Sequence, residues 1–287
     1  MNFRDFIPNK LLLAKQIKSA KKAPLFLTQI QRRHIDEIVN QNSENILFAG
    51  YPKSGNTWLR FMIYHYFHLK NGGNEDVLTY EDLKSLQSDS IENGISPPLV
   101  KGYPPIVRTH LSYFNEFDQA FCKTIYVHRN PLDTLVSAFH FFVLNRNAIT
   151  KKSPSNSIDN YVKYNYTHWI RHFESYYNCD QNICLTSFEN LKKDPVKEFS
   201  EVLLFLGEKI DRNFLQKSVE LSDFSSINKM TIDSGQTYGS GQKGIQKGIF
   251  TRKGKVGSFR SELKDSTIEY VKKELAKSDL NSLVDFD

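Results

Sequence analysis

Short apolar runs alternate with longer segments of helical periodicity along this chain of 287 residues. The runs lie at residues 45–49, 106–109, 124–128 and 183–186, and each contains β-branched or aromatic residues. Continuous apolar runs of this kind are typical of strands buried on both faces, and strands that alternate with helices form parallel sheets. The pattern therefore predicts an α/β fold with a central, mainly parallel sheet flanked by helices.

Helix signals follow these strands. Residues 57–70 form a long apolar helical pattern directly after the first strand. Asn130-Pro131 supplies an N-cap and a favoured first helical residue, which predicts a helix over residues 131–142. Asp194-Pro195 predicts another helix, which ends at Gly207, a residue type suited to a left-handed C-terminal position. Because no internal repeat or linker composition is visible, we expect residues 1–287 to form a single domain.

Composition and charge narrow the class of protein only a little. Lys and Arg number 38 and Asp and Glu 32, a net charge of +6 that suits an anionic ligand, nucleic acid or a membrane surface. The longest apolar stretches are too short to span a bilayer, and the first 20 residues lack a secretory pattern, which favours a cytoplasmic protein. Cys122, Cys179 and Cys184 cannot all pair and show no C-x-x-C spacing, so we expect buried thiols.

One segment departs from the regular alternation. From Ser234 to Arg260 the chain contains no acidic residue, and half of its 14 glycines lie between Gly235 and Gly257. A long loop of this kind is either an exposed surface segment or a clamp that closes over an anion. A nucleic-acid-binding module would use broadly spread phosphate contacts. Here the basic residues cluster around discrete turns, which disfavours that reading.

A phosphate-binding loop follows the first strand. Residues 50–57 read GYPKSGNT and match the G-x-x-x-x-G-K-[ST] frame except that Asn56 stands where the lysine should be. The glycines and the following helix N-terminus still direct N–H groups toward an anion, so the P-loop-like arrangement is preserved. Lys53, inside the loop, supplies the missing cation. Moving the lysine indicates an oxyanion other than the usual triphosphate.

A second candidate anion site follows the third strand. Arg129 lies at the strand end beside a helix N-terminus, where a guanidinium suits a phosphate. Ser137 lies about two turns into that helix. Taken singly, Arg129 could instead pair with Asp133, and Ser137 could bond its own helix backbone.

Together these motifs resemble those of a known family. Residues 51–59 (YPKSGNTWL) resemble the 5′-phosphosulfate loop of soluble, cytosolic-type sulfotransferases, which use 3′-phosphoadenosine 5′-phosphosulfate (PAPS). Arg129 and Ser137 resemble the family's 3′-phosphate motif, and residues 252–257 (RKGKVG) its closing R-K-G-x-x-G signature. The resemblance covers residues 46–260 and implies a P-loop-like three-layer domain. It also implies a PAPS donor, adenosine 3′,5′-bisphosphate (PAP) as product, no required metal, and a small-molecule acceptor rather than nucleic acid or membrane.

The resemblance also assigns the residues that would hold the nucleotide. Trp58 and Phe224 are expected to contact the adenine ring, because stacking on aromatic side chains is worth about 1–3 kcal/mol per base. Three of the predicted site residues depart from the family pattern: Asn56 replaces Thr, Phe188 replaces Tyr, and Arg108 replaces Lys. The full set implied for the nucleotide is Lys53, Ser54, Gly55, Asn56, Thr57, Trp58, Arg129, Ser137, Phe188, Ser222, Phe224, Arg252, Lys253 and Gly254.

The catalytic residues are predicted from the same resemblance. His110, in Arg-Thr-His-Leu, matches the family's K-T-H-L segment, although a single His at a strand end is more often structural. A neutral imidazole suits the removal of a hydroxyl proton, so His110 is the predicted base. Arg108 would supply charge to the sulfuryl oxygens, and Lys53 would stabilise the departing bridging oxygen. Ser137 is expected, from the family alone, to hold Lys53 away until the acceptor binds.

Several alternatives and gaps remain at the level of sequence. A P-loop kinase using ATP and Mg²⁺ would need a lysine at position 56, and a carbohydrate-directed sulfotransferase would share the donor motifs. The pairs His65/His68 and His168/His172 have helical spacing but no metalloprotease motif, so we expect no metal site. The acceptor pocket should involve residues 71–80, 88–103, 145–160 and 235–250. The sequence indicates neither the acceptor nor the oligomeric state.

Overall fold

The computed structural model describes residues 27–41, 44–86, 91, 100–144, 157–233 and 254–286. Among these residues a single four-stranded sheet has the order β2-β1-β3-β4, with every neighbouring pair parallel. The strands are β1 (Ile46–Ala49), β2 (Ile106–Thr109), β3 (Lys123–His128) and β4 (Ile183–Ser187). The predicted α/β fold with a parallel sheet is therefore confirmed, and β2 was predicted with its observed bounds.

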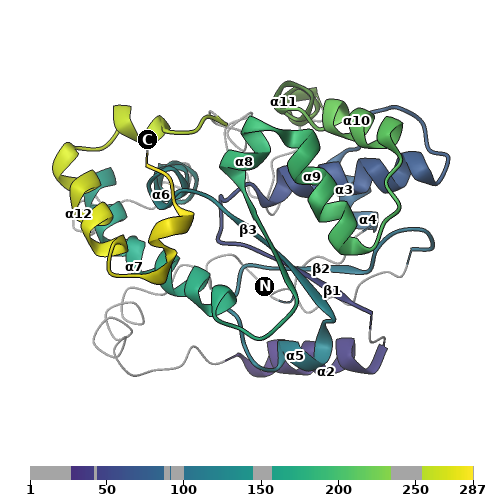
Figure 1. Cartoon of the computed structure of the whole chain (residues 1–287), viewed down its shortest axis with the longest axis horizontal. Helices are drawn as coiled ribbons and strands as arrows, with labels where there is room; N and C mark the ends of the chain where they lie inside the picture. Colours follow the sequence, from purple (N-terminus) through teal and green to yellow (C-terminus); the bar gives the residue numbers. More distant parts are fainter. Residues whose placement is uncertain are drawn as a thin grey trace.

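Helices cover both faces of the sheet (Figure 1). Ile46 and Phe48 of β1 pack on one face with residues of α3, α9 and α10. Leu47 and Ala49, which point the other way, pack with α2, α5 and α7. This alternation follows from the two-residue period of a strand and accounts for the three layers.

The bounds of the helices complete the description. On the first face lie α3 (Asn56–Lys70), α9 (Pro195–Leu206) and α10 (Arg212–Leu221). The helices α4 (Tyr80–Leu86) and α11 (Phe224–Asp233) pack against α3. Elsewhere lie α2 (Gln29–Gln41), α5 (Phe117–Ala120), α6 (Pro131–Ala138), α7 (Ile158–Tyr177), α8 (Phe188–Lys193) and α12 (Asp265–Leu275). A π-helix spans Phe139–Leu144, and 3-10 helices span Ser258–Ser261 and Asp279–Leu283.

Two predicted helix starts have the expected caps: Asn130 caps α6, and Asp194 accepts a hydrogen bond from Lys197 N at 3.0 Å and caps α9. The Asn130 side chain accepts hydrogen bonds from the backbone N–H groups of Leu132 and Asp133, at 2.9 and 3.4 Å, and α6 begins at Pro131. The helix predicted to reach residue 142 instead ends as an α-helix at Ala138 and continues as a π-helix to Leu144. π-Helical turns are frequent at functional sites, and this one leads toward the predicted acceptor side.

The cysteine prediction was wrong in part. Cys122 is exposed, whereas Cys179 and Cys184 are half-buried, and none of the three forms a disulfide. Cys122 follows α5 at the amino-terminal end of β3, where the chain enters the sheet from its surface. A short apolar context in the sequence does not distinguish such an entry point from the strand interior.

The described part of the chain lacks two kinds of feature. No helix there has the length and apolar content needed to cross a membrane. Within the same described ranges, no three His, Cys, Asp or Glu side chains gather closely enough to hold a metal ion.

Candidate active site

The register of the sheet brings the predicted motifs together along one edge. Ala49 of β1 pairs with Thr109 of β2, so Gly50 and His110 leave neighbouring strand ends side by side. On the other flank His128 of β3 pairs with Ser187 of β4, which places Arg129 beside Phe188. The carboxyl edge therefore presents, in the strand order β2-β1-β3-β4, the predicted base, the phosphate loop, the predicted phosphate-binding arginine and an aromatic ring. Ligands of open α/β sheets bind at such an edge, where the strand order reverses.

The phosphate loop depends on unusual backbone conformations. Lys53 has φ 74° and Gly55 has φ 101°, both in the left-handed region. Gly55 then caps α3 without a side-chain hydrogen bond. A Cβ atom at Gly55 would lie 2.7 Å from Phe188 Cδ2, so only glycine fits beside that ring. The loop thus presents the N-terminal N–H groups of α3, which suit an anion.

The serine of the loop gives a second sign of an anion site. Ser54 is fully buried, and its hydroxyl oxygen has no hydrogen-bond partner among the described residues. Buried hydroxyls are rarely left without a partner, so an unpaired one in a phosphate loop is consistent with a ligand. Thr57, the first-turn residue of α3, is half-buried beside it.

The Asn56 side chain forms hydrogen bonds within the phosphate loop. Its amide nitrogen lies 3.2 Å from the carbonyl oxygen of Gly50 and 3.3 Å from that of Tyr51, and it donates to both. A lysine at this position could not bridge two carbonyls of its own loop and also reach a triphosphate. The substitution at position 56 therefore converts a ligand-binding side chain into a brace for the loop.

His110 is held in one tautomer by the same loop. Its Nδ1 lies 2.7 Å from the Gly50 carbonyl oxygen, which can only accept, so Nδ1 carries the proton. The Asn56 amide nitrogen lies 3.3 Å from Nδ1, and because both atoms carry hydrogen this second contact is not a hydrogen bond. Nε2 is therefore the ring nitrogen with the lone pair, the arrangement that a base requires.

Arg108 adjoins the basic nitrogen. Its Nη1 lies 3.3 Å from His110 Nε2, and the Arg108 residue is buried. Burial, followed by the charge of Arg108, lowers the pKa of His110 from 6.5 to about 3, so the imidazole is neutral at pH 7. The predicted pair His110 and Arg108 is thus brought into contact.

Lys53 lies in the phosphate loop, and Ser137 lies in α6. The Lys53 ammonium lies 4.1 Å from the centroid of the Phe141 ring, over the π-helix that follows α6. Ser137 is half-buried in the second turn of α6. An ammonium over an aromatic face is stabilised by cation–π attraction, which orients the lysine without neutralising it.

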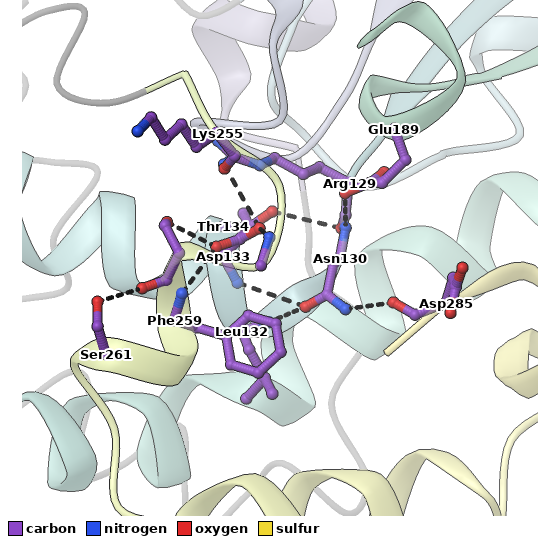
Figure 2. Close-up of polar contacts among 12 residues, drawn as sticks. Arg129, Asn130, Leu132, Asp133, Thr134, Glu189, Lys255, Phe259, Ser261 and Asp285 are labelled. Atoms are coloured by element: carbon purple, nitrogen blue, oxygen red, sulfur yellow. Dashed lines mark hydrogen bonds and ion pairs between the residues drawn. The ribbon is translucent and has the colours of Figure 1, made fainter. Parts of the chain in front are cut away.

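Arg129 is held by three neighbours. Its guanidinium lies 4.2 Å from the centroid of the Phe188 ring, and Nη2 donates to the Lys255 carbonyl oxygen at 2.9 Å. Asp133 lies 3.7 Å from the same nitrogen, so the pairing with Asp133 considered from sequence is present. Figure 2 shows Arg129, Asp133 and Lys255 where the start of α6 meets the segment that carries Lys255.

Asp133 anchors the segment that begins at Gly254, a role that the sequence analysis missed. This fully buried carboxylate accepts hydrogen bonds from Gly257 N at 2.7 Å, Ser258 Oγ at 2.8 Å and Phe259 N at 3.1 Å. Figure 2 shows Asp133 beside Phe259. The signal available in the sequence was an acidic residue four positions after Arg129, combined with a later segment that has none.

The predicted aromatic residues form a group beside Arg129. The Trp58 and Phe188 rings lie 5.6 Å apart at 65°, and the Lys192 ammonium lies 4.8 Å from the Trp58 centroid and 5.6 Å from that of Phe224. A Cβ atom at Gly254 would lie 2.6 Å from the Phe224 ring. A cavity of about 300 Å³ adjoins this group, lined by Glu189, Lys192, Lys193, Val256 and Asp285.

Three residues predicted to bind the nucleotide have no described contact with this aromatic group: Ser222, Arg252 and Lys253. Ser222 is fully buried, and its hydroxyl lies 2.8 Å from His65 Nδ1. Leu78 N donates a hydrogen bond to His65 Nε2, so His65 Nδ1 carries the proton. Nδ1–H then donates a hydrogen bond to the Ser222 hydroxyl oxygen. Ser222 therefore links the C-terminal cap of α10 to His65 of α3. Arg252 and Lys253 lie outside the described residues.

Comparison with known proteins defines the class of this protein. A family model described as a sulfotransferase domain matches residues 43–278, most of the chain. The chain belongs to the sulfotransferase family and is an enzyme of that class, as its sequence motifs predict.

Individual relatives are distant but match over most of their length. Sulfotransferase 1B1 of Canis lupus familiaris is 25% identical over 89% of this chain and 90% of the relative. Sulfotransferase 1E1 of Rattus norvegicus is 24% identical over 81% and 82%. Among solved structures, retinol dehydratase with androsterone and PAP has a TM-score of 0.64 at 18% identity, covering 88% of this chain and 87% of that one. Mouse sulfotransferase SULT7A1 with PAP has a TM-score of 0.58 at 19% identity, covering 90% and 94%. These two structures support the fold.

Proposed function

We propose that this sulfotransferase moves the sulfuryl group of PAPS to a hydroxyl or amine of a small-molecule acceptor. One observation carries the proposal: the order of groups along the carboxyl edge of the sheet. His110, the loop at residues 50–57, Arg129 and Phe188 follow one another in the strand order β2-β1-β3-β4. PAPS presents its sulfuryl group, 5′-phosphate, 3′-phosphate and adenine in the corresponding order.

The residues present fit this donor. Ser54 contributes a buried hydroxyl without a partner in the described chain, and the N–H groups at the N-terminus of α3 suit the 5′-phosphosulfate. Arg129 is proposed to bind the 3′-phosphate, with Arg252 and Lys253 closing over it. Trp58 and Phe224 are proposed to contact adenine. Structures that share the fold contain PAP, which supports the same donor here.

The chemistry assigns one task to each of three side chains. His110 Nε2 takes the proton of the acceptor group as the new bond to sulfur forms. The bond from sulfur to the 5′-phosphate oxygen breaks, PAP leaves with its electron pair, and Lys53 stabilises the charge that develops on this bridging oxygen. Arg108 stabilises the peripheral sulfuryl oxygens. In-line transfer of this kind needs mainly positioning and charge stabilisation, as in phosphoryl transfer.

We propose a sulfotransferase rather than a kinase, and an enzyme of the cytoplasm. Asn56 occupies the position of a kinase lysine and donates to carbonyl groups of its own loop, so it is not available to a triphosphate. Three cysteines without a disulfide suit a reducing compartment. We propose that the reaction needs no metal ion, because Lys53, Arg108 and Arg129 supply the positive charge.

Labelled sulfate transfer tests the proposal. The purified enzyme is incubated with ³⁵S-labelled PAPS and a library of phenols, alcohols, amines and sugars, and the products are identified by mass spectrometry. His110→Ala is expected to lower turnover by at least about 100-fold, because general base catalysis typically contributes about 10²–10⁴-fold. Its affinity for PAP, measured by calorimetry, should be unchanged. A His110→Ala variant with full turnover would refute the assignment of the base.

An assay with ATP distinguishes the proposed sulfotransferase from the alternative, a P-loop kinase. The same library is incubated with γ-labelled ATP and Mg²⁺. Transfer of phosphate from ATP without any transfer of sulfate from PAPS would refute the proposed donor. Lys53→Ala is expected to slow sulfate transfer while retaining PAP binding, because its charge is needed most as the bridging oxygen departs.

A further inference from the structure

A buried polar chain leads from the sheet core to the backbone of His110. The Tyr126 hydroxyl lies 2.9 Å from His172 Nδ1, and His172 Nε2 lies 3.1 Å from the carbonyl oxygen of His110. Tyr126 and His172 are both buried. The chain connects β3, α7 and the end of β2, three elements that are separate in the sequence.

The proton positions in this chain follow from its chemistry. The carbonyl oxygen of His110 only accepts, so His172 Nε2 donates, and Nδ1 must then accept from the Tyr126 hydroxyl. Burial lowers the pKa of His172 to about 4 and raises the pKa of Tyr126, so both groups stay neutral at pH 7. Both donors of this hydrogen-bonded series, the Tyr126 hydroxyl and His172 Nε2–H, are therefore paired with an acceptor, which favours one fixed arrangement.

Two residues that follow His172 in α7, Ser175 and Tyr176, form hydrogen bonds with the backbone of residues 111–113. The Tyr176 hydroxyl donates to the Leu111 carbonyl oxygen at 2.9 Å. Ser175 Oγ accepts from Tyr113 N at 2.9 Å and donates to the His172 carbonyl oxygen at 2.7 Å. Residues 110–113 belong to no helix or strand. Side chains of α7 thus make the polar contacts that regular secondary structure would otherwise provide.

His172 also contacts the phosphate loop. The edge of one ring meets the face of the other between Tyr51 and His172, with centroids 5.4 Å apart at 87°. Since His110 Nδ1 is bonded to Gly50, next to Tyr51, one imidazole on α7 touches both segments that must be aligned. A shift of either segment would change the distance between the base and the donor.

We propose that His172 is a positioning residue for the base His110, assisted by Ser175 and Tyr176. It fixes the backbone of residue 110 so that Nδ1–H stays on Gly50 and Nε2 faces the reacting groups. This inference rests on the proposed function of His110. In the sequence His172 was noted only as half of a helical histidine pair and was considered as a metal ligand.

Matched variants on α7 test the proposal. Tyr176→Phe removes one buried hydroxyl that bonds the segment after β2. Tyr166→Phe, the control, removes a hydroxyl on the same helix that lies 3.3 Å from Glu274, on the side of α12. His172→Phe removes the donor to His110, and His172→Gln places a side-chain N–H near the position of Nε2. Turnover with saturating donor and acceptor is measured together with PAP affinity and thermal stability.

We expect turnover to fall only in the variants whose side chains contact the segment after β2, at His172 and Tyr176. His172→Phe should lower kcat about 10- to 100-fold, since misplacing a reacting group by about 1 Å can cost about 100-fold. Tyr176→Phe should lower kcat less, His172→Gln should recover part of the loss, and Tyr166→Phe should retain wild-type kcat. PAP affinity should stay within about twofold of wild type throughout, because these side chains act on the base rather than on the phosphates. Unchanged kcat in His172→Phe and Tyr176→Phe, or an equal loss in Tyr166→Phe, would overturn the proposal.

A second readout does not depend on turnover. ¹⁵N chemical shifts of the His110 imidazole report which ring nitrogen carries the proton. The wild type should show the proton on Nδ1, whereas His172→Phe and Tyr176→Phe should show a mixture of tautomers as the bond to Gly50 loosens. Identical His110 shifts in all variants would overturn the positioning role. If the wild type transfers no sulfate from PAPS, the proposed function fails, and these shifts still decide the role of His172.

Discussion

Lowering the pH from 7 to 5 is expected to destabilise this enzyme strongly, because three imidazoles besides that of His110 are buried in neutral form. His65, His128 and His172 are 0%, 8% and 4% exposed. Burial is the first cause in each case and lowers the pKa of each from 6.5 to about 4. In the unfolded chain the same groups accept a proton near their ordinary pKa.

The sign and size of the effect follow from proton linkage. Between about pH 6.5 and pH 4 the unfolded chain binds more protons than the folded one, so the free energy of unfolding rises with pH and falls on acidification. At pH 5 each unfolded imidazole is nearly fully protonated, whereas each folded one is mostly neutral. Integrated from pH 7 to pH 5, this difference removes about 2 kcal/mol for each imidazole. Three such groups remove about 6 kcal/mol, an amount comparable with a typical total stability of about 5–15 kcal/mol.

Urea denaturation between pH 5 and pH 7.5 measures this dependence, with one variant to isolate a single imidazole. His128 stacks on Phe173 with ring centroids 4.7 Å apart. His128→Phe should reduce the loss of stability between pH 7 and pH 5 by about 2 kcal/mol. Phe173→Leu, the control, weakens the same packing without removing a titratable group, so its pH dependence should match wild type. If His128→Phe kept the full pH dependence, the reasoning from buried neutral histidines would be wrong.

Three further predictions concern the donor side of the site. Arg129→Ala should weaken PAP binding about 10- to 100-fold through loss of a charged hydrogen bond, whereas adenosine 5′-phosphosulfate, which lacks the 3′-phosphate, should lose little; equal losses by calorimetry would contradict the assignment. Gly55→Ala should lower the free energy of unfolding, measured with urea, by about 1–3 kcal/mol because of the positive φ of residue 55. The same substitution should cost less in a Phe188→Ala background, because the contact at 2.7 Å is then absent. Equal costs in the two backgrounds would argue against that contact. Asp133→Asn should destabilise the fold by about 3 kcal/mol, since it breaks a buried ionic group bonded to residues 257–259; a melting temperature equal to wild type would rule this out.

Local sequence signals predicted the frame of the molecule well. The β2 strand follows from three β-branched residues, Ile106, Val107 and Thr109, in a run between Pro105 and His110, and its bounds agree with the structure. The cap at Asn130 follows from the chemistry of one side chain and a neighbouring proline. Because these signals act over a few residues, composition and order are enough to read them. Family membership, the fold and the enzyme class were therefore within reach and are confirmed.

The contacts that organise the site depend on distant parts of the chain. Asp133 meets residues more than 120 positions later, and His172 meets a carbonyl 62 positions earlier. Neither pairing has a local signature, because a buried Asp and a helical His look the same as exposed ones in a sequence. The helix α7 was itself not predicted, since its polar and apolar residues alternate without a clear start until Ser157 caps it. The assignments of individual site residues remain predictions for the experiments above.

The position of β2 at the margin of the sheet separates two kinds of evolutionary change. Its single strand neighbour in the described sheet is β1, and the segment after it carries the predicted base on the outer flank. The loops assigned to the nucleotide leave the inner strands and β4 instead. Mutations on this flank would therefore change the surroundings of the predicted base without altering the loops of the inner strands, which are proposed to hold the donor.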